Sequence, residues 1–310
     1  MQIITLTLNP ALDKSAKVDG IVPDHKLKCY AINYQPGGGG INITRVLNRL
    51  GVKSKCVFPI GGNAGLYLNE LVINENIQPL SIRINSWTRE NLSVIDTHTG
   101  LQYRFGMPGN SLSPNELIEI EKSIENLLDE NDIFVLSGSL AEEMQDNYYA
   151  GLIRRLTGKN IKIVLDTSGS ALKEALKEGV YLIKPNQREL AQLAGKDFLS
   201  TAEQEEFALE IIKSQAVKYI VVSLGARGAF IASENGIMYQ STPSVKVKST
   251  IGAGDSMVAG LIYAIQNNYP EELMLKWGTA CGVATTMSEG TGLANKENID
   301  KVFTMINDFE

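Results

Sequence analysis

The feature that most constrains the fold of this chain is a repeated alternation of short apolar runs with helical patterns. The β-rich runs lie at residues 2–8, 54–59, 133–136, 161–165, 181–183 and 219–222. Amphipathic helical patterns lie between them, for example at 42–50 and 64–74. Such runs are typical of parallel strands covered by helices on both faces. The sequence therefore predicts an α/β fold with a central parallel sheet, followed by C-terminal helices over about 254–266, 271–288 and 297–308.

Two segments interrupt this alternation. Residues 13–34 and 88–106 lack helical periodicity and are interpreted as extended strands, with a period of two at 92–96 and a turn at Thr99-Gly100. Because they form no βα unit, we expect them to join in a small sheet that stands off the main domain. A small isolated sheet needs a cover for its apolar face. A lid over a site and an oligomer contact both provide one.

The composition limits the classes of partner. The net charge of -6 and the pI near 5.2 argue against a nucleic-acid binder and a polybasic membrane anchor. The three cysteines are far apart and have no CxxC spacing, which favours reduced thiols in a cytosolic protein. We see no signal-peptide pattern and no membrane-length apolar run, and two histidines are too few for a His-based metal cluster. We therefore expect a compact cytoplasmic protein.

A glycine turn at Gly252-Ala253-Gly254-Asp255 opens directly into an apolar helical pattern. This arrangement delivers backbone N–H groups to a helix N-terminus, where anionic oxygens are favoured. Asp255 adds a carboxylate that can accept a hydroxyl proton beside that anion site. The two features together are the minimum for phosphoryl transfer to a hydroxyl. The alternative is an aspartate that only caps the helix.

A second glycine loop runs from Pro36 to Thr44 and also leads into a helical pattern. Its four consecutive glycines are costly in chain entropy, and no packing need for them is evident from the sequence. We interpret them as a place where a ligand approaches the backbone, with Asn42 offering a donor and an acceptor to a polyol. A flexible hinge is the alternative. The loop matches neither a Walker A motif nor G-x-G-x-x-G, because Asn42 occupies the third glycine position.

Three charged residues are candidates for holding a sugar phosphate. Asp13 follows the C-terminal end of the first strand, the edge where open α/β sheets bind ligands, and can hold two adjacent hydroxyls. Arg89 and Arg104 lie in the expected lid and could clamp a phosphate. Each has an ordinary alternative, a turn aspartate for Asp13 and solvated strand charges for the arginines.

Further polar clusters follow other predicted strands. In Lys184-Pro185-Asn186-Gln187-Arg188-Glu189, Asn186 and Glu189 have the spacing of a capping box, which is the structural interpretation. The functional interpretation places Asn186 toward phosphates and Glu189 near Mg²⁺ waters. The segments 223–228 and 137–139 add small polar groups at the same sheet edge. Since all these clusters fall just beyond strands, we predict a common cleft.

Together these motifs resemble the ribokinase-like (PfkB) sugar kinase family, over essentially the whole chain. The glycine-Asn loop at 38–44 and the run Ser249-Thr250-Ile251-Gly252-Ala253-Gly254-Asp255 match its two signatures. Within the family the likeness is greatest to the 6-phosphofructokinase branch. That likeness rests on residues 5–8, 36–42, 87–92, 103–105 and 184–186.

The resemblance implies a three-layer α/β/α fold with a β-sheet lid that pairs in a homodimer. The core would comprise 1–12, 35–87 and 107–310, and the lid 13–34 and 88–106. The implied activity is ATP-dependent phosphorylation of a ketose phosphate, with fructose 6-phosphate as the first candidate. Asp255 would be the base, and the amides of Gly252, Ala253 and Gly254 would stabilise the moving phosphoryl group. Because Asp255 lies at the positive end of a helix, we expect its carboxylate to stay ionised and to be a weak base.

The resemblance also assigns binding roles. The sugar phosphate would contact Asp13, Lys26, Gly38, Gly39, Asn42, Arg89, Arg104 and Ser139. ATP would be lined by Lys184, Asn186, Ser223, Gly225 and Gly228, with Glu189 near Mg²⁺. Many members bind K⁺ through backbone groups, here around Ser249, Ile251 and 286–290. Ser249 stands where an aspartate is frequent, which leaves K⁺ activation open.

One departure separates branches of the family. Fructose-1-phosphate and tagatose-6-phosphate kinases typically read Gly-Gly-Lys-Gly where this chain reads Gly38-Gly39-Gly40. The missing lysine favours fructose 6-phosphate, and the other two ketose phosphates remain alternatives. A nicotinamide oxidoreductase lacks its fingerprint here. A non-catalytic sugar-phosphate sensor would need the Asp255 loop to be vestigial.

Overall fold

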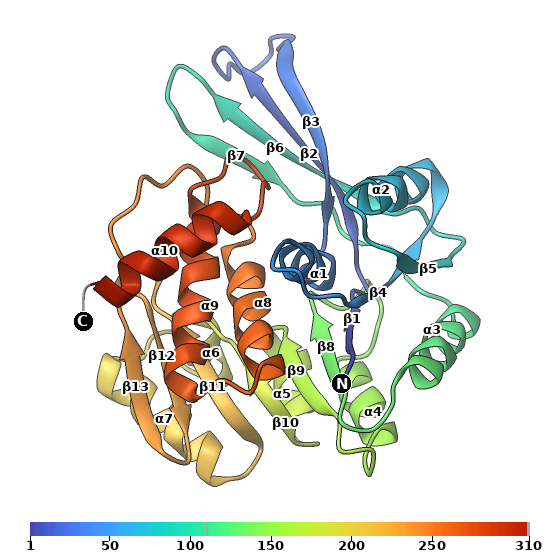
Figure 1. Cartoon of the computed structure of the whole chain (residues 1–310). Helices are drawn as coiled ribbons and strands as arrows, with labels where there is room; N and C mark the ends of the chain where they lie inside the picture. The colour runs from blue at the N-terminus through green and yellow to red at the C-terminus, as the bar shows by residue number, and fades with distance from the viewer. Residues whose placement is uncertain (110, 309–310) are drawn as a thin grey trace.

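The computed structural model describes residues 1–109 and 111–308. In this part of the chain a nine-stranded sheet has the order β13-β12-β11-β10-β9-β8-β1-β4-β5 (Figure 1). Its strands are β1 (Ile3–Leu6), β4 (Lys55–Ile60), β5 (Pro79–Arg83), β8 (Ile133–Ser137), β9 (Lys162–Asp166), β10 (Val180–Ile183), β11 (Val217–Ser223), β12 (Ala229–Ser233) and β13 (Gly236–Gln240). From β5 to β11 all neighbours are parallel, and β12 and β13 add an antiparallel edge.

Helices cover both faces of this sheet, so its central strands are buried on both sides. In β8, Ile133 and Val135 pack with one set of helices, whereas Phe134 and Leu136 pack with the other. The first set is α1 (Gly39–Arg49), α8 (Ala253–Gln266), α9 (Glu271–Thr286) and α10 (Lys296–Asp308). The second is α3 (Pro114–Leu127), α4 (Tyr148–Arg155), α5 (Gly169–Leu176), α6 (Gln187–Leu193) and α7 (Thr201–Lys213). The predicted three-layer α/β fold is confirmed.

A second sheet of four strands stands above the main body in the order β3-β2-β6-β7 (Figure 1). Its strands are β2 (Ala11–Val18), β3 (Cys29–Gly37), β6 (Arg89–Asp96) and β7 (Gln102–Phe105). Ala11 pairs with both Gly37 and Arg89, so the three strands start or end together where the small sheet meets the body. The helix α2 (Gly62–Asn74) packs against β2 and β3 at this base.

Three details differ from the sequence-based expectation. The strands at the two edges of the sheet, β5 on one side and the antiparallel pair β12 and β13 on the other, were not predicted. The helix α1 begins at Gly39 rather than near 42, because Thr7 Oγ1 accepts a hydrogen bond from Ile41 N at 3.1 Å and so substitutes for a missing cap. The helix expected over 271–288 ends at Thr286. No helix within the described residues is long and apolar enough to cross a membrane.

Candidate active site

The glycine turn before α8 forms the centre of the candidate site. Gly252 has φ of 75°, a left-handed conformation that glycine adopts without strain, and α8 starts at the next residue. No side chain caps this helix. The first-turn N–H groups of a helix have no partners within it, so this end attracts anions. Lys184 reaches the same turn, since a Cβ on Gly254 would lie 3.3 Å from Lys184 Nζ.

Asp255 lies in the first turn of α8 and faces the glycine-Asn loop. Asn42 donates a hydrogen bond from Nδ2 to Asp255 Oδ2 at 2.8 Å, which joins two residues 213 positions apart. Burial and, next in size, the nearby charge of Asp166 together raise the pKa of Asp255 to about 6, against the lowering effects of Asn42 and Lys184. The expectation of a weakly basic carboxylate is therefore wrong, because desolvation outweighs the positive end of the helix.

Asp166 is a site residue that sequence reasoning missed. It ends β9, and Lys184 Nζ lies 3.5 Å from its Oδ1. Burial lowers the pKa of Lys184, but Asp166, Glu189 and Asp255 together outweigh this effect and raise it. Lys184 is only 6% exposed and stays charged. The available signal was a carboxylate directly after a buried apolar strand, the same signal that pointed to polar groups after other strands.

The glycine loop has packing reasons that the sequence did not reveal. A Cβ on Gly37 would lie 2.3 Å from Asp13 Oδ2, and one on Gly40 would lie 2.6 Å from Thr7 Oγ1. A Cβ on Gly39 would lie 2.1 Å from Ser137 Oγ, and Gly38 has φ of 121°. All four positions therefore require glycine for close approach or conformation. The expectation that packing does not explain them is wrong.

Asp13 lies on β2 and not in a turn, and it pairs with Asn91 across the small sheet. Asn91 donates from Nδ2 to Asp13 Oδ1 at 2.8 Å. Burial raises the pKa of Asp13, against lowering by Asn91 and by the charges of Arg89 and Arg104. Three cationic side chains, Arg89, Arg104 and Arg45, are therefore close enough to act on this carboxylate.

The two arginines differ in how they are held. Arg89 donates from Nη2 to Asn9 O at 3.0 Å and from Nη1 to Met107 O at 3.1 Å. Its Nε is buried and has no partner among the described residues, a donor that an anion could satisfy. Arg104 is exposed on β7.

Ser139 and Lys26 occupy different ends of this region. Asn9 donates from Nδ2 to Ser139 Oγ at 3.2 Å, so Ser139 lies beside the base of the small sheet. Lys26 lies between β2 and β3, beyond the Val18–Cys29 pair at the outer end of the sheet. Since Asp13 lies near the opposite end of the same strand, the structure does not bring Lys26 together with the other residues within one chain.

The residues predicted to line a nucleotide form one edge of the site. Asn186 and Glu189 make the capping box of α6, with Glu189 N to Asn186 Oδ1 and Asn186 N to Glu189 Oε2 both 2.9 Å, so the structural interpretation is confirmed. Asn186 forms a bridge with Ser223, which ends β11. Gly225 and Gly228 have φ of 64° and 100°, and a Cβ on Gly228 would lie 1.9 Å from Gln240 O.

The two segments considered for K⁺ contact each other. Ser249 Oγ donates to Gly290 O at 2.7 Å and accepts from Ile251 N at 3.3 Å. The N–H groups of Lys248 and Ser249 both donate to Thr286 O. Ser249 therefore uses its hydroxyl to hold the two backbone segments together.

The side chains of the candidate site do not form a metal site without a bound substrate. The described residues contain no group of three His, Cys, Asp or Glu side chains suited to hold an ion. Mg²⁺ commonly binds through one or two carboxylates plus substrate phosphates, and Glu189 with its second oxygen Oε1 fits that limited role.

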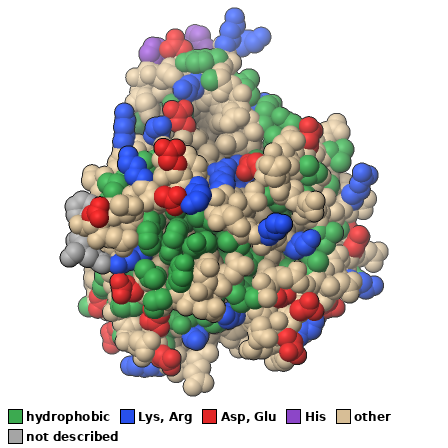
Figure 2. Space-filling model, viewed as in Figure 1, with side chains coloured by type: hydrophobic (Ala, Val, Ile, Leu, Met, Phe, Trp, Pro, Cys, Tyr) green, Lys and Arg blue, Asp and Glu red, His purple; other side chains and the backbone are tan. Residues whose placement is uncertain are grey.

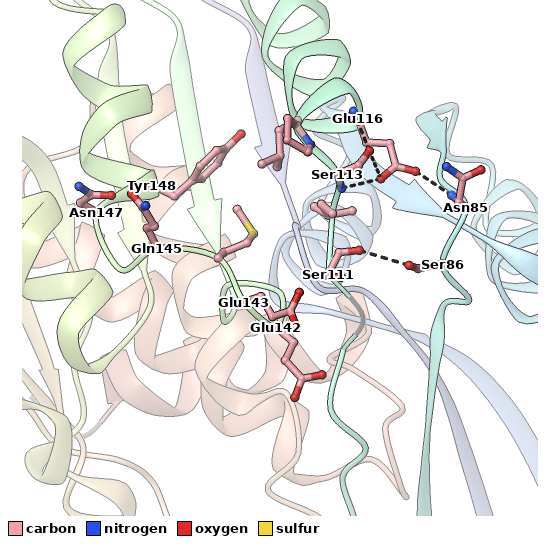
Figure 3. Close-up of a pocket in the computed structure, with 14 residues that line it drawn as sticks. Asn85, Ser86, Ser111, Ser113, Glu116, Glu142, Glu143, Gln145, Asn147 and Tyr148 are labelled. Carbon is pink, nitrogen blue, oxygen red and sulfur yellow. Dashed lines mark hydrogen bonds between the residues drawn. The ribbon is translucent and has the colours of Figure 1, made fainter.

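A large cavity elsewhere in the molecule is separate from these residues. It has a volume of about 560 Å³ and lies between α3, α4 and the loops at 85–86 and 142–147 (Figure 3). None of the predicted site residues lines it among the described positions. Its carboxylate Glu116 points toward Ser113 and Asn85 and caps α3 (Figure 3).

Comparison with known proteins identifies the class of protein. Residues 7–298 match the model of the family described as pfkB family carbohydrate kinase, so the chain belongs to this family. It is 36% identical over 307 residues to ATP-dependent 6-phosphofructokinase isozyme 2 of Escherichia coli (strain K12), covering 99% of each. It is 34% identical over 304 residues to a protein of the same name from Mycobacterium tuberculosis (strain CDC 1551 / Oshkosh), covering 98% of this chain and 89% of that one.

Solved structures agree with this relationship. The chain resembles phosphofructokinase-2 from Escherichia coli in complex with substrates and products, with a TM-score of 0.95 and 36% identity over 99% of this chain and 100% of that one. The same protein in complex with potassium gives a TM-score of 0.95 and 36% identity over 99% of both chains. Ribokinase from Thermotoga maritima, at 22% identity and a TM-score of 0.77 over 98% and 99%, shares the fold.

Proposed function

We propose that this carbohydrate kinase transfers the γ-phosphoryl group of ATP to the C1 hydroxyl of fructose 6-phosphate, giving fructose 1,6-bisphosphate. The relatives named 6-phosphofructokinase support the choice of substrate. The observation that carries the proposal is the position of Asp255 at the uncapped N-terminus of α8, in contact with Asn42 and near Lys184. A hydroxyl acceptor, an anion site and a cation thus meet at one point.

The reaction follows from these groups. Asp255, whose pKa is raised to about 6, is ionised at neutral pH and accepts the C1 hydroxyl proton as the O–P bond forms. The first-turn N–H groups of α8 and the charge of Lys184 stabilise the phosphoryl oxygens in transit. ADP leaves on the side of Lys184. When bound with ATP, Mg²⁺ would neutralise charge on the phosphates, with Glu189 nearby.

The sugar phosphate occupies the base of the small sheet. Asp13 and Asn42 hold the sugar hydroxyls, and Gly38, Gly39 and Ser139 line the same edge. Arg89, through its unpartnered Nε, and Arg104 bind the 6-phosphate.

The nucleotide lies along Asn186, Ser223, Gly225 and Gly228, opposite the sugar. K⁺ binds backbone oxygens of the segment at Ser249–Ile251 and that at 286–290, supported by the potassium complex of the Escherichia coli relative. Turnover measured with either K⁺ or Na⁺ as the only alkali cation tests this part. We expect faster turnover with K⁺, and equal rates would contradict the K⁺ site.

The small sheet acts as a lid and as a homodimer contact. Its outer strands expose apolar side chains, and green side chains are visible at the top of Figure 2, where Figure 1 places this sheet. The exposed large apolar residues of these two strands are Tyr30 and Ile32 of β3 and Tyr103 and Phe105 of β7. A second copy of the sheet provides a matching apolar cover. We place the enzyme in the cytoplasm, where its sugar phosphates and ATP occur.

The deciding experiment is ATP-to-ADP turnover on fructose 6-phosphate, tagatose 6-phosphate and fructose 1-phosphate, compared as kcat/KM. The Asp255→Asn variant, prepared in parallel, measures contaminating kinase. We expect fructose 6-phosphate to lead clearly. A lead for tagatose 6-phosphate would keep the site and change the substrate. Tight binding of a sugar phosphate without turnover would identify a sensor instead.

A further inference from the structure

Arg45 is a fully buried cation one turn along α1 from Asn42. It is 2% exposed. Its Nε lies 2.7 Å and its Nη2 2.6 Å from Glu75 Oε1, at the C-terminal end of α2. Its Nη1 donates to Pro36 O at 3.1 Å and to Asn42 Oδ1 at 3.3 Å. A chain of hydrogen bonds therefore runs from Glu75 through Arg45 and Asn42 to Asp255.

The chemistry of the side chains fixes the direction of this chain. A guanidinium can only donate hydrogen bonds, so the atom of Asn42 that faces Arg45 must be the acceptor Oδ1. The amide has one oxygen and one nitrogen, so Nδ2 must then face Asp255. An amide N–H is a good partner for an ionised carboxylate, whereas the opposite orientation would suit a protonated one.

We propose that Arg45 is a positioning residue for phosphoryl transfer, whose guanidinium holds the Asn42 amide so that Nδ2, and not Oδ1, faces Asp255. The inference rests on the proposed function, since Asp255 is the base of that reaction. It concerns a side chain that has no contact with the reacting atoms and that acts on Asp255 through Asn42. Its charge also lowers the pKa of Asp13.

Asp255 needs this orientation because most of its surroundings oppose its charge. Burial and the carboxylates Asp166 and Asp13 favour the protonated form, whereas Asn42 and Lys184 favour the ionised form. The positive charge of Lys184 is also attracted by the carboxylates of Asp166 and Glu189. Without Arg45, the amide could turn and accept a hydrogen bond from protonated Asp255.

Removal of Arg45 leaves Glu75 with a second cationic partner. Arg49 Nη2 also pairs with Glu75, with Oε2 at 3.2 Å, and Glu75 is 28% exposed. Arg49 donates to Leu293 O and Ala294 O and has no contact with Asn42. Arg49→Gln is therefore a matched control, since it removes a Glu75 partner from the same helix without touching the amide.

The experiment compares the pH dependence of kcat in Arg45→Gln, Arg45→Lys and Arg49→Gln. Glutamine can donate or accept and does not fix the amide, whereas lysine can only donate. In Arg45→Gln we expect the acid limb of kcat to move up by about one pH unit, a loss of about tenfold below the limb with recovery toward pH 8–9. Arg45→Lys and Arg49→Gln should keep the wild-type limb.

A readout independent of activity separates this inference from the proposed function. The carboxyl ¹³C resonance of Asp255, assigned by its absence in Asp255→Asn, reports the titration in the folded protein. Its apparent pKa should rise in Arg45→Gln only. An unchanged titration, or an equal loss of kcat at every pH, would overturn the positioning role. Absence of turnover in the wild type would overturn the proposed function and leave the titration result standing.

Discussion

The backbone at Gly39 lies so close to Ser137 that a Cβ atom at position 39 would stand 2.1 Å from Ser137 Oγ. Gly39→Ala should therefore displace Ser137 and lower stability by about 1–3 kcal/mol, with a higher KM for fructose 6-phosphate. Ser137→Gly in the same chain should relieve part of the loss. A double-mutant cycle from thermal unfolding and KM measures the coupling. Additive effects would show that the contact does not constrain the site. Gly151→Ala, in an open position on α4, is the control.

Asp255→Asn should lower kcat by roughly 10²–10⁴-fold, because the amide cannot accept the hydroxyl proton. Binding of fructose 6-phosphate should change little, since the amide introduced at position 255 keeps an oxygen that can accept from Asn42 Nδ2. Single-turnover kinetics and calorimetric binding measure the two effects. A kcat near that of the wild type would exclude Asp255 as the base.

Because the pKa of Asp255 is raised in the folded state, this group makes the protein less stable as pH rises, whereas a carboxylate in an ion pair makes it more stable. Between its ordinary value of 3.8 and about 6 the folded state binds more protons than the unfolded state, so this group's contribution is lost as pH rises through 6. Asp255→Asn should therefore be more stable than wild type at pH 8, by at most about 3 kcal/mol, and not at pH 4. Urea unfolding at the two pH values checks this. A constant difference would contradict it.

Removal of Arg89 should lower both substrate affinity and stability, whereas removal of Arg104 should lower substrate affinity alone. Arg104 is exposed, so Arg104→Ala should raise the KM for fructose 6-phosphate by roughly 10–100-fold with an unchanged melting temperature. Arg89 also bonds Asn9 O and Met107 O, so Arg89→Ala should raise KM and lower stability. Steady-state kinetics and thermal unfolding separate the cases. An unchanged KM in both variants would remove the phosphate clamp.

The proposed homodimer should depend on the outer strands of the small sheet. Ile32→Asp places a charge on β3 at a side chain that is 52% exposed, and should shift the protein to monomers in sedimentation velocity. Phe198→Ser removes a side chain that is 73% exposed but lies between α6 and α7, and should leave the mass unchanged. If both variants sediment as wild type, the dimer uses another face.

Strand positions in the body were predictable because their residues are buried on both faces and therefore apolar throughout. The run at 133–136 became β8 and that at 219–222 lies within β11. The edge strands β12 and β13 were harder to predict from the sequence. Gly236–Gln240 is partly exposed and mixes polar with apolar residues, so its pattern is weak.

The candidate carboxylates and amides could be selected from the sequence where they lie in glycine loops, as Asp255 and Asn42 do, and the structure joins these two side chains by a hydrogen bond. Asp166 lies in no glycine loop. Its place in the site becomes visible only through Lys184, which follows β10 and whose Nζ lies 3.5 Å from Asp166 Oδ1. The pairing of Arg45 with Glu75 spans 30 positions and is set by how α1 packs on α2. Local pattern cannot show such contacts, because they exist only after the helices are placed.

Only Gly38 separates the last residue of β3, Gly37, from the first residue of α1, Gly39. Gly38 has φ of 121°, which other residues rarely adopt, so the link between the small sheet and the helix that carries Asn42 is both short and fixed in conformation. Ile43, Val46 and Leu47 anchor the same helix in the core of the main body. The proposed sugar site at the base of the small sheet and the amide that faces Asp255 therefore share one short, anchored segment of chain.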